Sequence, residues 1–135
     1  MRRFLIALAA IVTMAGTTPA PAQEAEIETV IREQLDAFLA EDVDTAFDYA
    51  SPSIRNMFRT PGNFGAMVRN GYPMVWRSDE VRFGMLEDRD DGLWQRVYIT
   101  DEAGTGHALE YRMTEVDGRW RISGVRVLDL AAVTA

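Results

Sequence analysis

The sequence predicts an α+β fold in which helices come first and a single antiparallel sheet follows. Two observations carry this prediction. Hydrophobic residues recur at helical spacing in the first half of the chain, and from Val75 onward they alternate with polar residues, which is the period of a strand with one buried face. Short turns separate the strand-like segments, so they pair as an antiparallel meander whose apolar face the helices must cover.

Two helices are predicted at the start of the domain. The first has its apolar positions three and four residues apart, at Ile27, Val30, Ile31, Leu35, Phe38 and Leu39. The second is short, begins after Asp42 or Asp44, and buries Ala46, Phe47 and Ala50. Both therefore present one face to a core.

Two further helices begin with the same signal, a capping side chain followed by a proline at the first helical position. Ser51-Pro52 and Thr60-Pro61 carry that signal, and Gly71 ends the last of these helices.

The stretch after Gly71 is predicted to be extended, because the residue before a proline avoids the helical region. If Tyr72, Met74 and Trp76 share one face of this stretch, they lie over the open end of the fold.

Four strands complete the chain. The turns between them are RDDG, DEAGTG and Asp117-Gly118, of which the last is a strong hairpin signal. The residues expected to face inward are Val81, Phe83 and Met85, then Leu93, Val97 and Ile99, then Leu109, Tyr111 and Met113, then Trp120 and Ile122.

Residues 1–22 have the pattern of a secretory signal peptide. Arg2 and Arg3 precede an apolar run, and Ala20-Pro21-Ala22 forms a small-residue cleavage site. The run is shorter than the roughly 20 residues that span a membrane. We therefore expect cleavage near Ala22, a single domain over residues 23–135, no membrane span, and a periplasmic or secreted protein.

Composition excludes several classes of function. The chain has no cysteine and one histidine, so neither a disulfide nor a metal site is expected, and no cofactor motif is present. The net charge of −7 becomes −9 once Arg2 and Arg3 are removed, with 12 arginines against 21 acidic residues. Such a chain repels polyanions, so nucleic acid is not expected as a partner.

The chain resembles a known family from about residue 31 to residue 128. The segment ASPSIRNMFRTPGNFGAMVRNGYPMVWRS, the following VRFG and the later DGRWRISG resemble an exported bacterial family called domain of unknown function 4864. Helices followed by a sheet that ends in DGRWRISG are also similar to the nuclear-transport-factor-2-like superfamily. The resemblance implies helices packed in the concave face of a strongly curved four-stranded sheet, a cone whose open end forms a cavity. The family has no assigned activity, so it implies no catalytic residue.

Polar side chains on the inward strand faces are the first candidates for a site in that cavity, since a buried polar group must be paired or must meet a ligand. By alternation these are Gln95, His107 and Tyr111. The structural alternatives are a hydrogen-bonded core amide for Gln95, an exposed strand end for His107 and core packing for Tyr111.

The helical half adds Tyr49, Tyr72 and Trp76 as candidates for the cavity and its rim. Tyr72 and Trp76 have an alternative role as a lid that closes the core. Asp48 is a possible general base, although Phe47 and Ala50 are expected to occupy the buried face of the same helix.

Two functions stay open at this point. The first is a non-enzymatic domain that holds a small apolar ligand or a partner in the cone. The second is a small isomerase- or hydratase-type enzyme that uses Tyr111 with Asp48 or His107. The inward strand faces offer no clear carboxylate beside Tyr111, which favours binding.

A homodimer is the last expectation. Trp94, Arg96 and Tyr98 alternate on the outward face of the second strand, with Val125 and Val127 assigned to the same side. An aromatic outward face is typical of an interface. Cover by the C-terminal segment DLAAVTA is the alternative.

Overall fold

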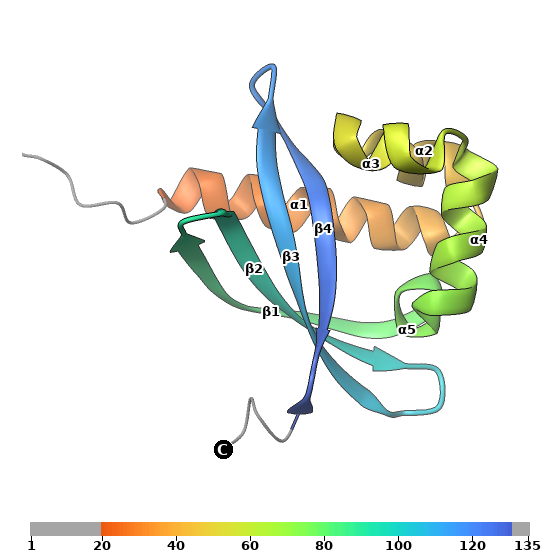
Figure 1. Cartoon of the computed structure of the whole chain (residues 1–135). Helices are drawn as coiled ribbons and strands as arrows, with labels where there is room; N and C mark the ends of the chain where they lie inside the picture. Colours follow the sequence, from red (N-terminus) through yellow and green to blue (C-terminus); the bar gives the residue numbers. More distant parts are fainter. Residues whose placement is uncertain (1–19, 131–135) are drawn as a thin grey trace, which may run out of the picture.

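The computed structural model describes residues 20–130 of the chain, and the predicted signal peptide therefore lies almost wholly outside the described residues. The helices come first and the strands follow, as Figure 1 shows, so the α+β prediction is confirmed. The helices are α1 (Pro21–Leu39), α2 (Val43–Asp48), α3 (Pro52–Phe58), α4 (Pro61–Gly71) and α5 (Pro73–Trp76). The strands are β1 (Ser78–Arg89), β2 (Gly92–Asp101), β3 (Gly106–Val116) and β4 (Arg119–Leu128).

The sheet curves around α1. Its strands are antiparallel and lie in the order β1-β2-β3-β4, yet both edge strands contact α1. A flat sheet could not bring both of its edges to one helix, so the predicted cone is present. The inward stripe of α1 is fully buried, and its members Ile27, Ile31, Leu35 and Phe38 are each at most 1% exposed.

The predicted helix starts are confirmed by their caps. The Asp42 carboxylate accepts a hydrogen bond from the Thr45 backbone N–H at 3.2 Å, and the Thr60 hydroxyl accepts one from the Asn63 backbone N–H at 3.1 Å. Ser51 caps α3 in the same way. Each cap satisfies a backbone donor that the first helical turn leaves unpaired.

The prediction of an extended stretch after Gly71 is wrong. Tyr72 is non-helical, at φ −135° and ψ 61°, but Pro73 then occupies the first position of the short helix α5. Because a helix turns by about 100° per residue, Tyr72, Met74 and Trp76 do not share a face. Met74 and Val75 are buried instead.

Two β-bulges change the alternation that the sequence suggested. In β1 the register shifts between Phe83 and Leu86, so Leu86 packs against the core and Met85, predicted to face inward, is 60% exposed. In β4 the shift falls between Ile122 and Gly124, and Val125, predicted to face outward, packs against the core. An extra residue in one strand moves each later side chain of that strand to the opposite face of the sheet from the one that alternation predicts.

The core lies between α1, the sheet and the α4–α5 pair. Four phenylalanines form its helical side, with ring centroids 5.4–5.8 Å apart in the successive pairs Phe38–Phe64, Phe47–Phe64 and Phe58–Phe64. Trp120 and Ile122 close the sheet side, at 7% and 4% exposure. No helix among the described residues is long and apolar enough to cross a membrane.

Candidate ligand cavity

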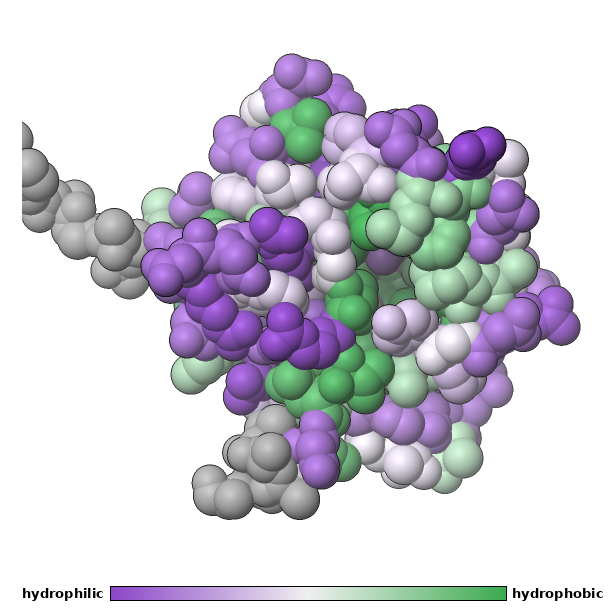
Figure 2. Space-filling model, viewed as in Figure 1, coloured by the Kyte–Doolittle hydropathy of each residue, from purple (hydrophilic) through white to green (hydrophobic). Residues whose placement is uncertain are grey.

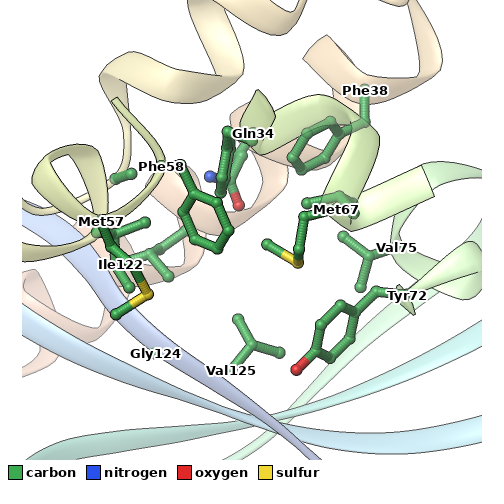
Figure 3. A pocket seen from close by; sticks show the side chains of 14 residues that line it. Gln34, Phe38, Met57, Phe58, Met67, Tyr72, Val75, Ile122, Gly124 and Val125 are labelled. Atoms are coloured by element: carbon green, nitrogen blue, oxygen red, sulfur yellow. The ribbon is translucent and has the colours of Figure 1, made fainter. Parts of the chain in front are cut away.

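A cavity of about 240 Å³ opens between the α3–α4 arm and β4. In Figure 2 the molecule is hollowed there, and hydrophobic residues surround the hollow. Figure 3 shows the side chains that line it: Gln34, Phe38, Ala50, Ile54, Met57, Phe58, Phe64, Met67, Val68, Tyr72, Val75, Ile122, Gly124 and Val125. Nearly all of this wall is apolar.

The cavity exists because α3 packs loosely while α4 packs closely. Gly65 lies so near α2 that a Cβ atom on it would be 2.5 Å from a methyl carbon of Val43, which fixes α4 against α2. Helix α3 has no fully buried residue of its own. Ile54 and Phe58 are half-buried, and Met57 is 67% exposed at the mouth.

Gln34 is the buried polar group of the cavity wall. Its side-chain Nε2 donates to the Ala46 carbonyl at 3.0 Å, which fixes the amide orientation because a carbonyl can only accept. The Oε1 atom therefore points the other way, toward the space between Phe58 and Met67 (Figure 3). The cavity thus offers one fixed acceptor inside a hydrophobic wall.

Tyr72 is the sequence-predicted candidate that lines this cavity. It joins α4 to α5, and its hydroxyl lies beside Val125 on the side of the cavity away from Gln34 (Figure 3). Its ring is half-buried. An acceptor at one end and a hydroxyl at the other give the cavity a polarity that an apolar wall alone would lack.

Tyr111 lies in the core of the sheet and does not line the cavity. Its side chain is 0% exposed, and its hydroxyl has no hydrogen-bond partner among the described residues. Burial raises the pKa of Tyr111 well above its ordinary value, and the nearby Tyr72 adds to the effect. The hydroxyl is therefore neutral and unpaired.

Gln95 is a structural residue of the β1 bulge. Its Nε2 atom lies 2.9 Å from the carbonyl oxygens of Gly84 and Arg96 and 3.4 Å from that of Met85, and it donates to these groups. It thus satisfies carbonyls that the bulge removes from the ladder. This is the satisfied core amide that the sequence offered as the alternative.

His107 and Trp76 meet at a different corner of the molecule. His107 Nε2 lies 2.8 Å from Asp101 Oδ2 in the β2–β3 turn, and both residues line a shallow depression with Trp76. The hydrogen bond from His107 is the main reason that the pKa of Asp101 is lowered. Trp76 also packs on Phe38, with ring centroids 5.8 Å apart.

Tyr49 does not line the cavity and lies beside α1. Its hydroxyl donates to the Glu33 carboxylate, and this hydrogen bond is the first cause that raises the pKa of Tyr49. The Arg121 guanidinium lies 5.8 Å from the centre of its ring. Asp48, the possible general base, is exposed on α2.

Sequence reasoning missed Gln34, although a signal for it was present. Gln34 occupies the same helical stripe as Ile27, Ile31 and Phe38. A polar residue on an otherwise apolar stripe is equivalent to a polar residue on an inward strand face, because in both places the buried polar group must be paired or must meet a ligand. Val125 lines the cavity because of the β4 bulge, which no sequence pattern predicted, whereas Ile122 precedes the bulge and faces inward as predicted.

The outward face of the sheet differs from its prediction. Trp94 is 6% exposed, because the guanidinium groups of Arg89 and Arg126 lie 5.3 and 4.7 Å from the centre of its ring. Its Nε1 donates to Asp91 Oδ1 at 2.8 Å. The expected open aromatic patch is thus largely covered by arginines of its own chain, while Arg96 and Tyr98 are half-buried.

Residues 20–130 contain no group of three or more His, Asp or Glu side chains that could hold a metal ion. The cone with its lateral cavity defines the fold as nuclear-transport-factor-2-like. The chain belongs to the family described as Domain of unknown function (DUF4864), whose profile matches residues 20–135. The resemblance to both groups is confirmed.

Solved structures agree on the fold. A SEC-C motif containing protein from Rhodopseudomonas palustris has a TM-score of 0.56 and 19% identity, over 78% of this chain and 80% of that one. An NTF-2 like protein of unknown function from Shewanella oneidensis MR-1 has a TM-score of 0.52 and 14% identity, over 78% and 98%. A protein of unknown function with a cystatin-like fold from Nostoc punctiforme PCC 73102 has a TM-score of 0.51 and 10% identity, over 80% of this chain and 91% of that one. No curated protein matches this chain by sequence.

Proposed function

We propose that the protein is an exported binding domain whose cavity holds a small, uncharged, apolar molecule with one hydrogen-bond donor. The observation that carries the proposal is the Gln34 Oε1 atom, a fixed acceptor in a wall that is apolar apart from it and the Tyr72 hydroxyl. An occupant without a donor would leave that oxygen unpaired, which costs free energy. A ligand with one N–H or O–H group satisfies it.

The size of the cavity limits the ligand. Its volume of about 240 Å³ lies below the roughly 300–1,000 Å³ of pockets that hold drug-sized molecules. A molecule of up to three rings, or a short chain, suits it. The exposed methionine Met57 at the mouth and the half-buried Met67 within provide an adaptable wall, since methionine side chains adjust to different shapes.

Binding is supported over isomerase or hydratase chemistry by where the candidate groups lie. The described residues that line the cavity include no carboxylate and no histidine. Tyr111 and His107 stand four residues apart on β3, a separation of about 13 Å at the usual rise of a strand. Asp48 is exposed on α2.

Fluorescence titration with N-phenyl-1-naphthylamine tests the proposal, since this probe is uncharged, apolar and carries one N–H group. We expect saturable enhancement with wild type. Met67→Trp, which fills the cavity, should abolish it. Gln34→Leu should weaken binding by about tenfold, the worth of one hydrogen bond in a buried site. The N-methylated probe, which lacks the donor, should bind Gln34→Leu more tightly than wild type, because in wild type it leaves the Oε1 atom unpaired. Equal binding of the N–H probe to all three proteins would overturn the proposal.

Export rests on the pattern of residues 1–22. Ala20 and the first residues of α1 adjoin the expected cleavage site. The intact mass of the protein recovered from the periplasm should correspond to a start within a residue or two of Gln23. A mass that retains Met1 would contradict export with cleavage.

Self-association through Trp94, Arg96 and Tyr98 stays a prediction, and it is an alternative to any other occupant of the outward face of the sheet. The cover that Arg89 and Arg126 place over Trp94 reduces the apolar area available to it. Sedimentation equilibrium of wild type tests this prediction, and a monomer at tens of micromolar, where a weak dimer would still form, would contradict it.

A further inference from the structure

The outward face of the sheet carries a group of arginines that the cavity does not use. We call it the arginine face and define it as Arg82, Arg89, Arg96, Arg112 and Arg126. The strand register places these residues on the side opposite the inward residues of β2 and β3, in the pairs Arg82↔Tyr98, Arg89↔Gly92, Trp94↔Arg112, Arg96↔Glu110 and Glu110↔Arg126. In Figure 2, strongly hydrophilic residues gather over the part of the sheet where β2 and β3 lie side by side in Figure 1.

The charge of this face is opposite to that of the rest of the chain. Its five arginines stand against four acidic residues, Glu80, Glu87, Asp91 and Glu110, which gives a net charge of +1. The rest of residues 20–130 carries seven arginines and 17 acidic residues. Positive charge is thus concentrated on one face of an acidic protein.

Part of the face is built as a rigid support. The Glu110 side chain is 4% exposed, and Arg89 donates to both of its oxygens, Nη1 to Oε1 at 3.1 Å and Nη2 to Oε2 at 2.9 Å. Arg126 lies 3.2 Å from the same carboxylate. Glu110 therefore holds two guanidinium groups that both lie over the Trp94 ring.

Arg82 and Arg96 are held less firmly by acidic residues than Arg89 and Arg126 are. Arg96 lies across the strands from Glu110 and helps to lower the pKa of that carboxyl, but no ion pair joins the two side chains. Among the described residues, neither Arg82 nor Arg96 forms an ion pair, and the buried Nε atom of Arg96 has no hydrogen-bond partner. Arg82 lies over the Tyr98 ring, 5.0 Å from its centre. A guanidinium that is held on an aromatic ring loses little freedom when it binds an anion, so the donors of Arg82 are available.

Gly84 fixes how these side chains lie. A Cβ atom at this position would be 2.9 Å from the Tyr98 ring and 3.2 Å from the Arg96 Cβ atom. Glycine therefore lets the Tyr98 ring and the stem of Arg96 lie flat across β1. A depression of about 490 Å³ adjoins them, and its wall contains Arg82 and Tyr98 together with one carboxylate, that of Glu80. An extended segment of another chain has space to lie there.

We propose that the arginine face binds an acidic peptide segment of a partner protein, with the carboxylates of that segment paired to Arg82 and Arg96. The guanidinium fork matches a carboxylate with two hydrogen bonds. A second copy of the chain in a two-fold arrangement would set arginines against arginines, which is repulsive. A membrane or nucleic acid extends beyond the face and meets the acidic remainder, whereas a short segment does not.

Fluorescence anisotropy with a rhodamine-labelled octaglutamate tests the proposal, and labelled octaglutamine is the neutral control peptide. We expect octaglutamate alone to bind wild type, and its affinity to fall as salt rises. The double variant Arg82→Gln/Arg96→Gln should lose at least about tenfold in affinity. The matched variant Arg59→Gln/Arg69→Gln changes the net charge equally on the α3–α4 arm and should bind as wild type does.

Gly84→Ala separates arrangement from charge, because it displaces Tyr98 and Arg96 without altering a charged group. It should weaken binding several-fold, while thermal unfolding of each variant shows that it is folded. Equal losses in the two double variants would show a general charge effect and overturn the proposal. It is also overturned if octaglutamate does not bind, if phosphatidylglycerol vesicles bind the face more tightly than the peptide, or if wild type is a dimer that Arg82→Gln/Arg96→Gln dissociates.

Discussion

Replacing Tyr111 with phenylalanine should stabilise the protein, which is the reverse of what most changes at a fully buried residue do. The Tyr111 hydroxyl is removed from water and has no partner among the described residues. An unpaired buried polar group costs about 1–3 kcal/mol, and phenylalanine removes that group while it keeps the ring. Allowing for the small space left behind, we expect a gain of about 1–2 kcal/mol. The melting temperature should rise by about 4–8 °C in a domain of this size.

Tyr49→Phe is the matched control. That hydroxyl donates to the Glu33 carboxylate, so the same chemical change should lower stability by about 0.5–1.5 kcal/mol. Calorimetry or urea unfolding of the three proteins at neutral pH measures both effects. Opposite signs for the two substitutions are the expected result, because one hydroxyl is paired and the other is not.

Alkaline pH adds an independent check on Tyr111. Burial raises its pKa in the folded protein above the ordinary value of 10.0. Below pH 10 the Tyr111 hydroxyl is protonated in both the folded and the unfolded chain, and ionisation does not change stability. Above pH 10 the hydroxyl ionises in the unfolded chain only, so the free energy of unfolding of wild type falls as the pH rises further. Tyr111→Phe lacks this loss, so its advantage over wild type should widen between pH 8 and pH 11. If Tyr111→Phe melts more than about 2 °C below wild type, the hydroxyl has a partner and the reasoning is wrong.

Three further predictions concern packing and charge. Trp120→Ala should lower the free energy of unfolding by about 3–5 kcal/mol, because Trp120 is a buried aromatic of the core; a change in melting temperature of only a degree or two would contradict its role as an anchor. Gly65→Ala should cost about 1–3 kcal/mol, since its Cβ would meet Val43 at 2.5 Å, whereas Gly71→Ala, where nothing lies within 4 Å, should be nearly neutral in the same urea titration. Glu110→Gln should cost about 2 kcal/mol at pH 7, because it weakens the hold on Arg89 and the more exposed Arg126. The hydrogen bond from Arg89 holds the pKa of Glu110 below its usual 4.5, so this contribution is present above that pH and is lost as the pH falls through the lowered pKa; wild type and Glu110→Gln should converge in acid, and a constant difference would contradict the ion pair.

The elements of the fold could be predicted because their signals are local. Ser51 and Thr60 each cap a helix through a bond within the same turn, and the strand order follows from short turns between alternating segments. The bulges could not be predicted, since one extra residue at position 123 or in the Gly84–Met85 pair leaves the local composition unchanged. Their position depends on how two strands meet, which alternation within one strand does not report.

The candidate site was less predictable for the same reason. Its wall combines α1, the α3–α4 arm and the part of β4 on both sides of the bulge, and a cavity forms where side chains do not pack together. The strand faces directed attention to Gln95 and His107, which are both occupied by hydrogen bonds of their own. Tyr72 could be predicted because it follows a helix end, whereas Gln34 lies on a helical stripe that strand alternation does not report.

The loose packing of α3 has a consequence for how the cavity is reached. A helix with no fully buried residue loses little apolar contact when it separates from the domain, so its amide hydrogens should exchange with solvent long before those of α1. Such local opening would expose the interior between Phe58 and Ile122 while the sheet stays folded. The rate at which a molecule enters or leaves would then be set by the transient unfolding of seven residues rather than by the width of a permanent entrance.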